Sequence, residues 1–294
     1  MPEPANSLTF RGRLAVAVAL VVAYLLAFGL GIFASVAALR GADLSIPSSA
    51  DGGPVSYDWT YVTVEICLTM IAVGLVVGAA ELTAGGGFRW PGGDIAHRTS
   101  PVGPVVIVAT IAVYALALVS AQLIQQAMLA HGAGLPAPET RAGTPVSAAM
   151  ILAAHAGIGE EMIVVAGLAM AVGLFTRRAV IALPILIAAR LAYHVYYGWA
   201  VAALVLWAAV SAYIIWRWRS WTILTGFIAL HIAWDALIHW DLWANGYAIL
   251  YLFGVPAVAV LVACFIVDRR WWAAPSASSE PELGRVRTSP ISAP

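Results

Sequence analysis

The sequence of 294 residues contains few charges and no lysine. Charged residues make up 10% and apolar residues 62%, against about 25% and roughly 45–50% in soluble globular domains. All 15 basic residues are arginines, and 15 acidic residues balance them. A net charge of zero argues against nucleic-acid binding, which normally requires a basic surface. The composition excludes an ordinary soluble domain and predicts a polytopic membrane protein, in agreement with a mean hydropathy of +0.89.

Cysteine is scarce as well, and no cysteine motif is present. The chain has two cysteines, Cys67 and Cys264, each within a hydrophobic stretch and without a CxxC partner. We interpret both as small apolar packing residues rather than as ligands or disulfide partners.

Long hydrophobic runs, by contrast, fill most of the chain. About 20 apolar residues span the hydrocarbon core, and backbone hydrogen bonds in lipid must close within the protein. We therefore predict an all-α polytopic protein with about eight transmembrane helices and a central polar cavity. The predicted helices are 14–39, 61–82, 102–130, 146–175, 179–197, 199–216, 221–239 and 247–267. The fifth and sixth meet at Tyr197-Gly198, which requires a tight turn.

The segments between and beyond these helices predict the domain organisation. Residues 1–13 form an N-terminal segment, 14–270 a transmembrane domain, and 271–294 a disordered tail rich in Pro, Ser and Ala. The first apolar core is longer than the 7–15 residues usual for a signal peptide, so we interpret it as a helix that is retained.

The arginines predict the orientation in the cell membrane. Cytoplasmic segments carry an excess of basic residues. Both termini are therefore placed in the cytoplasm, and only Arg40 and Arg141 fall on the opposite side. The twelve arginines placed inside are Arg11, Arg13, Arg89, Arg98, Arg177, Arg178, Arg217, Arg219, Arg269, Arg270, Arg285 and Arg287.

Three short clusters, with five acidic or histidine residues in total, lie inside predicted helices of the second half of the chain, where a charge costs roughly 2.5–3.5 kcal/mol on insertion scales. These residues are Glu160, Glu161, His194, His231 and Asp235. Because each is expensive at that depth, the set predicts a functional site. Glu160 and His231 lie near the middle of their helices, whereas His194 lies nearer the external end of the fifth.

Spacing predicts how these side chains are presented. His231 and Asp235 are four residues apart and share a helix face, and Arg190 and His194 have the same spacing on the fifth predicted helix. Glu160 and Glu161 point about 100° apart, so we expect only one to face the centre of the site and the other to meet a different partner.

Two imidazoles and a carboxylate at similar depth can surround and activate one water molecule. Two other interpretations stay open from the residues alone. Intramembrane histidines often form hydrogen bonds between helices, and buried acids also serve proton-coupled transport. His155 points about 140° away from Glu160, so we interpret it as a structural residue, and Trp199 as part of an aromatic belt.

Three short motifs resemble those of the CPBP intramembrane proteases, which include the type II CAAX prenyl endopeptidases and bacteriocin-processing relatives. The family pattern is EExxxR, then FxxxH, then HxxxN or HxxxD on successive helices of a mostly eight-helix core. The matching stretches are EEMIVV (160–165), RLAYH (190–194) and HIAWD (231–235). The resemblance covers residues 145–240, and the first three helices only in number and topology.

The resemblance implies an endopeptidase that acts on a membrane-associated peptide or protein. Glu160 would be the general base that activates water, with assistance from His194. His231 and Asp235 would stabilise the oxyanion, Asp235 either in its protonated form or by orienting His231. Some relatives are immunity-like, so a catalytically silent protein of this fold is the alternative. The family suggests a cytosolic opening, whereas the depth of His194 points to the outer leaflet.

The family has been described both as metal-dependent and as glutamate-type. Glu160, His194 and His231 would be the ligands if zinc were bound. No HExxH motif is present, so we favour catalysis without a cofactor.

Two positions depart from the family pattern. Val165 replaces the arginine expected four residues after Glu161, and Arg190 replaces the phenylalanine expected four before His194. We predict that these changes compensate, because Arg190 could reach Glu161 from the neighbouring helix and restore the ion pair.

Overall fold

The structure is a computed structural model, and it describes residues 8–40, 59–84, 103–132, 146–239 and 250–267. All regular elements in these ranges are helical, and they form one helical run for each predicted helix. The N-terminal segment to residue 7 and the predicted tail 271–294 lie outside the described residues. The runs are α1 (Phe10–Leu39); α2 (Trp59–Ala84); α3 (Pro104–Ala130); α4 (Val146–Gly159), η2 (Glu160–Gly167) and α5 (Leu168–Gly173); α6 (Ala179–Ala192); η3 (Val195–Ala203) and α7 (Leu204–Trp218); α8 (Trp221–His239); η5 (Leu250–Gly254) and α10 (Val255–Val267).

The helices indicate a membrane protein. Among the described residues, five segments are long and apolar enough to cross a bilayer: Phe10–Gly29, Ile66–Thr83, Pro104–Ala130, Met150–Gly173 and Tyr197–Trp218. Three further apolar helices are shorter: Ala179–Ala192, Trp221–Leu237 and Leu250–Ile266. The predicted all-α class is confirmed for the described part of the chain. Several apolar helices of this length agree with a chain that crosses the membrane more than once.

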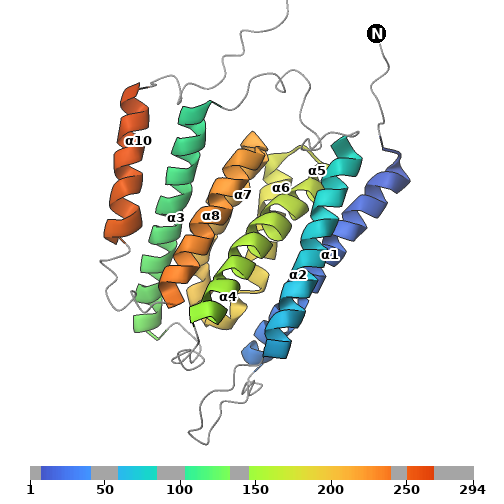
Figure 1. The fold of residues 1–294 in the computed structure, drawn as a ribbon, viewed down its shortest axis with the longest axis horizontal. Coiled ribbons are helices and arrows are strands. Elements are labelled where there is room, and N and C mark those ends of the chain that lie inside the picture. The colour runs from blue at the N-terminus through green and yellow to red at the C-terminus, as the bar shows by residue number, and fades with distance from the viewer. Residues whose placement is uncertain (1–7, 41–58, 85–102, 133–145, 240–249, 268–294) are drawn as a thin grey trace, which may run out of the picture.

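The helices lie side by side, with α10 at one edge of the bundle and α1 with α2 at the other (Figure 1). In the middle, α4 packs on α8, α3 packs on α7, and α6 packs on α7. The short element η2 contacts α1, α2, α6, α7 and α8. A residue on η2 can therefore reach side chains from several helices at once.

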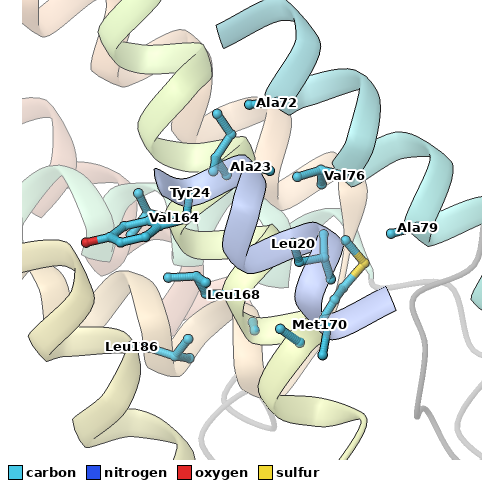
Figure 2. Packing of buried hydrophobic residues seen from close by; sticks show 14 of the residues in the cluster. Leu20, Ala23, Tyr24, Ala72, Val76, Ala79, Val164, Leu168, Met170 and Leu186 are labelled. Atoms are coloured by element: carbon cyan, nitrogen blue, oxygen red, sulfur yellow. The ribbon is translucent and has the colours of Figure 1, made fainter. Parts of the chain in front are cut away.

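Two apolar clusters meet at η2. One cluster, shown in Figure 2, packs α1 and α2 against η2 and α5 through side chains such as Leu20, Val76 and Val164. The other joins α3, α7 and α8 around Tyr114 and includes Val165 of η2. Because consecutive residues of η2 belong to different clusters, the carboxylates that begin this element are surrounded by packed protein.

The connection between the fifth and sixth predicted helices is a tight turn, as the sequence predicts. Gly198 has a φ of 63° and a ψ of −142°, a conformation that a side chain rarely allows. Helix α6, however, ends at Ala192 instead of at residue 197. The chain tightens there, because the amide of His194 donates to the carbonyl of Leu191 three residues earlier at 2.9 Å.

Candidate functional site

The two glutamates begin a π-helical segment within the helical run from Val146 to Gly173. Glu160 and Glu161 are the first residues of η2, which follows α4 without a break. Both are buried, with side-chain exposures of 9% for Glu160 and 0% for Glu161. Single π-helical turns inside α-helices are rare and frequently occur at functional sites. The π-helical backbone and the buried charges therefore both indicate a functional site at Glu160 and Glu161.

Arg190 supplies the counter-charge from the last turn of α6. Its guanidinium binds both oxygens of Glu161, with Nη1 donating to Oε2 at 3.4 Å and Nη2 donating to Oε1. Nη2 also lies 3.7 Å from Oε2 of Glu160. The ion pair between Arg190 and Glu161 that the sequence predicts is confirmed. A buried charge is stable only when it is paired and hydrogen-bonded, and Arg190 is 1% exposed.

Helix α7 holds the arginine from its other side. Cζ of Arg190 lies 3.6 Å from the centroid of the Trp207 ring, in cation–π contact. Nη1 also donates to Oγ of Ser211 at 2.8 Å, and that hydroxyl donates to the carbonyl of Ala208 at 3.1 Å. These contacts fix the plane of the guanidinium before any ligand binds.

His231 lies on α8 between carboxylates from two elements. Its Nδ1 lies 3.0 Å from Oε1 of Glu161, and because a carboxylate only accepts, Nδ1 is the donor. Its Nε2 lies 3.6 Å from Oδ2 of Asp235, one turn further along α8, and 3.9 Å from Oε2 of Glu160. The shared helix face of His231 and Asp235 is confirmed. The edge of Trp207 packs on the imidazole, with ring centroids 5.2 Å apart.

His194 reaches the same place by a different route from the one predicted. It lies beyond the end of α6, at the cap of η3, so it does not share a continuous helical stripe with Arg190. That part of the prediction was wrong, because the chain leaves α-helical geometry after Ala192. Nε2 of His194 nevertheless lies 3.6 Å from Oε2 of Glu160. The imidazole also packs against Tyr193 and Tyr197.

The two carboxylates differ in the hydrogen bonds that they accept. Glu161 accepts from Tyr114 at 2.8 Å as well as from Arg190 and His231. Oε2 of Glu160 is buried and has no hydrogen bond among the described residues, although nitrogens of His194, Arg190 and His231 lie 3.6, 3.7 and 3.9 Å away. Glu161 therefore accepts hydrogen bonds from three side chains, whereas Oε2 of Glu160 has a lone pair that can accept a hydrogen bond.

The two glutamates share more partners than their angular separation predicts. Both carboxylates contact Arg190 and His231, although Tyr114 is bonded to Glu161 alone. The guanidinium of Arg190 and the two ring nitrogens of His231 each lie close to both carboxylates. Residues 100° apart on one helix can thus share partners when those partners are bidentate.

Three residues of the site were missed by the sequence reasoning: Tyr114 on α3, and Trp207 and Ser211 on α7. Each lies in an apolar helix and is uncharged, so neither charge nor spacing distinguishes it from an ordinary packing residue. All three are buried. Their common property is contact with Glu161 or Arg190, which only the folded structure reveals.

The departure at Val165 is explained by its packing. Val165 is 3% exposed and belongs to the apolar cluster around Tyr114 and Trp207. An arginine at this position would place a second guanidinium inside that cluster. The cation comes from α6 instead, and among the described residues Arg190 is the buried arginine at this carboxylate pair.

The donor set does not fit a metal ion. No group of three His, Cys, Asp or Glu side chains in the described ranges is arranged to hold one. In the suggested ligand set, the imidazoles of His194 and His231 both lie near Oε2 of Glu160. The guanidinium of Arg190 lies 3.7 Å from the same oxygen. A metal cation bound there would be repelled by this fixed positive charge.

His155 has a structural partner outside the site. Its Nε2 lies 2.6 Å from Oγ1 of Thr69, which joins α4 to α2. This contact agrees with the interpretation of His155 as a structural residue. The side chain of His239, the last residue of α8, lies outside the described part of the structure.

The arrangement places two carboxylates, an arginine and two imidazoles in one buried cluster drawn from η2, α6, η3 and α8. Comparisons of the chain with family models, with curated proteins and with solved structures return no match.

Proposed function

We propose that this chain is an intramembrane endopeptidase in which Glu160 activates water to hydrolyse a peptide bond of a membrane-associated peptide or protein. The observation that carries the proposal is the contrast between the two glutamates. Glu161 accepts hydrogen bonds from three side chains, whereas the buried Oε2 of Glu160 accepts none from the described residues. A general base needs a free lone pair within reach of the proton that it removes.

The reaction follows from this difference. Glu160 removes a proton from a water molecule, and the water oxygen attacks the carbonyl carbon of the peptide bond. The C–N bond then breaks, and the proton passes from Glu160 to the departing nitrogen. The products are a new carboxyl terminus and a new amino terminus. His194, 3.6 Å from Oε2 of Glu160, helps to orient the carboxylate and the water.

His231 and Asp235 act on the oxyanion. Glu161 fixes the orientation of His231 through Nδ1, so Nε2 faces Glu160 and Asp235. In its protonated form, His231 donates from Nε2 to the negative oxygen that develops on the carbonyl. Asp235 orients the same nitrogen. Burial strengthens this interaction because little water screens it.

Arg190 and Glu161 support the reaction without touching the substrate. The resemblance of the three motifs to CPBP proteases agrees with this division of roles, although here the arginine comes from α6. We infer that the pair relocates the internal arginine–glutamate contact of that family. Glu161, Arg190, Trp207 and Ser211 then form one rigid support that holds His231 in place.

The cellular setting belongs to the same proposal. The chain crosses the cell membrane about eight times, both termini are cytoplasmic, and a polar cavity at the site admits the substrate. Six of the described arginines support this orientation, because they flank helix ends that the sequence places in the cytoplasm: Arg11, Arg13, Arg177, Arg178, Arg217 and Arg219. Zinc takes no part in the proposed reaction, and nucleic acid is no partner.

The proposal is tested with purified protein in detergent or liposomes. Wild type, Glu160→Gln and the control His155→Gln are incubated with a set of membrane peptides, with and without a chelator. We expect wild type and His155→Gln to cleave, Glu160→Gln to lose about 10²-fold or more of the rate, and the chelator to change nothing. Equal cleavage by Glu160→Gln would overturn the assigned base, and loss of cleavage with the chelator would indicate a metal.

A further inference from the structure

We propose that the site opens toward the extracytoplasmic side of the membrane and takes a peptide segment that lies at that surface. This inference rests on the proposed hydrolysis for its substrate class. It rests separately on the depth and the exposure of the site residues, which place the opening at one particular end of the bundle.

One end of the bundle is rich in arginine. Phe10 at the start of α1 packs edge-on against Phe175 after α5, with ring centroids 6.4 Å apart. A Cβ on Gly173 would lie 4.0 Å from the Trp216 ring near the end of α7. These contacts bring together three pairs of arginines, six of the eight arginines among the described residues: Arg11, Arg13, Arg177, Arg178, Arg217 and Arg219. By the positive-inside rule, this end faces the cytoplasm.

The site lies far from that end, and Phe28 of α1 gives its depth. The Phe28 ring stacks on Tyr193, the neighbour of His194, with centroids 4.4 Å apart. The Cζ atom of Phe28 also lies 3.7 Å from the position that a Cβ on Gly159 would take, next to Glu160. Both Glu160 and His194 are therefore level with Phe28.

The position of Phe28 along α1 gives the distance of the site from each end of the bundle. Phe28 lies 18 residues after Phe10, which is about 27 Å along a helix with a rise of 1.5 Å per residue. Only 11 residues, or about 17 Å, separate Phe28 from the other end of α1 at Leu39. Phe28 therefore lies nearer to the arginine-poor end of α1 than to the arginine-rich end.

Exposure within the cluster increases in one direction. Glu161 and Arg190 are 0% and 1% exposed, Glu160 is 9%, His194 is 12% and Asp235 is 20%. The most exposed residue, Asp235, is one helical turn beyond His231 toward the end of α8. Helix α8 begins next to Arg219 at the arginine-rich end, so its later turns lie farther from that end. Exposure within the cluster thus increases away from the arginine-rich end.

An exposed tryptophan stands beside this side of the site. Trp199 follows the turn at Gly198 in η3, five residues after His194, and is 82% exposed. Tryptophan is enriched at membrane–water boundaries, where its ring fits the headgroup region. A substrate from the cytoplasm would have to bring its backbone across about 27 Å of apolar protein and lipid, which is unfavourable without hydrogen-bond partners. A peptide at the opposite surface has the shorter distance of about 17 Å to cross.

Labelling of single cysteines tests the direction of access. The chain has only two cysteines, so Cys67→Ser with Cys264→Ala gives a background without thiols. Asp235→Cys and Val195→Cys probe the opening, Trp199→Cys reports its side of the membrane, and Arg217→Cys reports the arginine-rich side. Each variant is treated with a charged, membrane-impermeant maleimide in right-side-out and in inside-out vesicles.

We expect Asp235→Cys and Val195→Cys to be labelled in right-side-out vesicles together with Trp199→Cys, and Arg217→Cys only in inside-out vesicles. The proposal would be overturned if both opening probes were labelled in the same vesicles as Arg217→Cys. It would also be overturned if neither opening probe were labelled in either kind of vesicle. Val195→Cys changes no residue of the catalytic cluster, so it reports access even if Asp235→Cys does not fold.

The two proposals fail in different ways. If Arg217→Cys is labelled from outside and the opening probes from inside, the opening remains opposite the arginines, but the extracytoplasmic direction is overturned. If the labelling is as expected and no membrane peptide is cleaved, access is established and the proposed hydrolysis is what fails.

Discussion

The guanidinium of Arg190 binds both carboxylate oxygens of Glu161, although the two residues are 29 positions apart and lie on different helical elements. The contact joins α6 to η2 inside the bundle. It also explains how two departures from a familiar motif can cancel, because a valine takes the place of one arginine while another arginine arrives from α6.

Removal of Arg190 should destabilise the fold. In Arg190→Met the buried Glu161 loses its cation, and loss of one partner of a buried ion pair costs about 3–5 kcal/mol. Thermal unfolding in detergent should show a clear decrease in the melting temperature. The double variant Arg190→Met with Glu161→Gln should recover part of the loss, since it removes the uncompensated charge.

Arg178→Met is the matched control for that experiment. Arg178 caps the start of α6, is exposed, and has no side-chain cap hydrogen bond. Its loss should change the stability by no more than about 0.5 kcal/mol. If Arg190→Met were as mild as Arg178→Met, the ion pair would not be a supporting element.

Trp207 should be needed for the position of Arg190 and His231. A cation–π contact that is shielded from water is worth about 2 kcal/mol, against about 0.5–1 kcal/mol at an exposed site. Trp207→Leu should therefore lower both stability and the cleavage rate, while Trp207→Phe keeps part of each. The control is Trp218→Leu, whose ring lies 5.1 Å from the exposed Arg217. Equal effects of the two leucine variants would contradict the assignment.

Gly157 should control the approach of α4 to α8. A Cβ at this position would lie 2.6 Å from Cγ1 and 2.9 Å from the backbone nitrogen of Ile232, and backbone atoms cannot rotate away. Gly157→Ala should therefore separate the helices, cost about 1–3 kcal/mol, and shift His231 away from Glu161, which lowers the cleavage rate.

Gly78→Ala on α2 gives the comparison, because no atom lies within 4 Å of its added Cβ. Alanine favours a helix over glycine by about 1 kcal/mol, so this variant should be neutral or more stable. Unfolding in detergent and peptide cleavage measure both variants. A Gly157→Ala protein as stable as Gly78→Ala would show that α4 and α8 do not need their close contact.

The sequence was sufficient for the helices because hydrophobic length is a strong signal in lipid. It was also sufficient for the five ionisable residues, since a charge in an apolar run is costly wherever it occurs. It could not predict the π-helical turn at Glu160 or the early end of α6 at Ala192, because both depend on tertiary contacts and not on periodicity. Tyr114, Trp207 and Ser211 carry no charge, so only their contacts with Glu161 and Arg190 distinguish them.

The central claim is that Glu160 activates water for attack on a peptide bond, and oxygen-18 labelling tests it most directly. Wild type, Glu160→Gln and His155→Gln are incubated with a membrane peptide in H₂¹⁸O, and the products are weighed by mass spectrometry. The account predicts one ¹⁸O in the new carboxyl terminus for wild type and His155→Gln, and almost no product for Glu160→Gln. Product without ¹⁸O, or equal labelled product from Glu160→Gln, would contradict it.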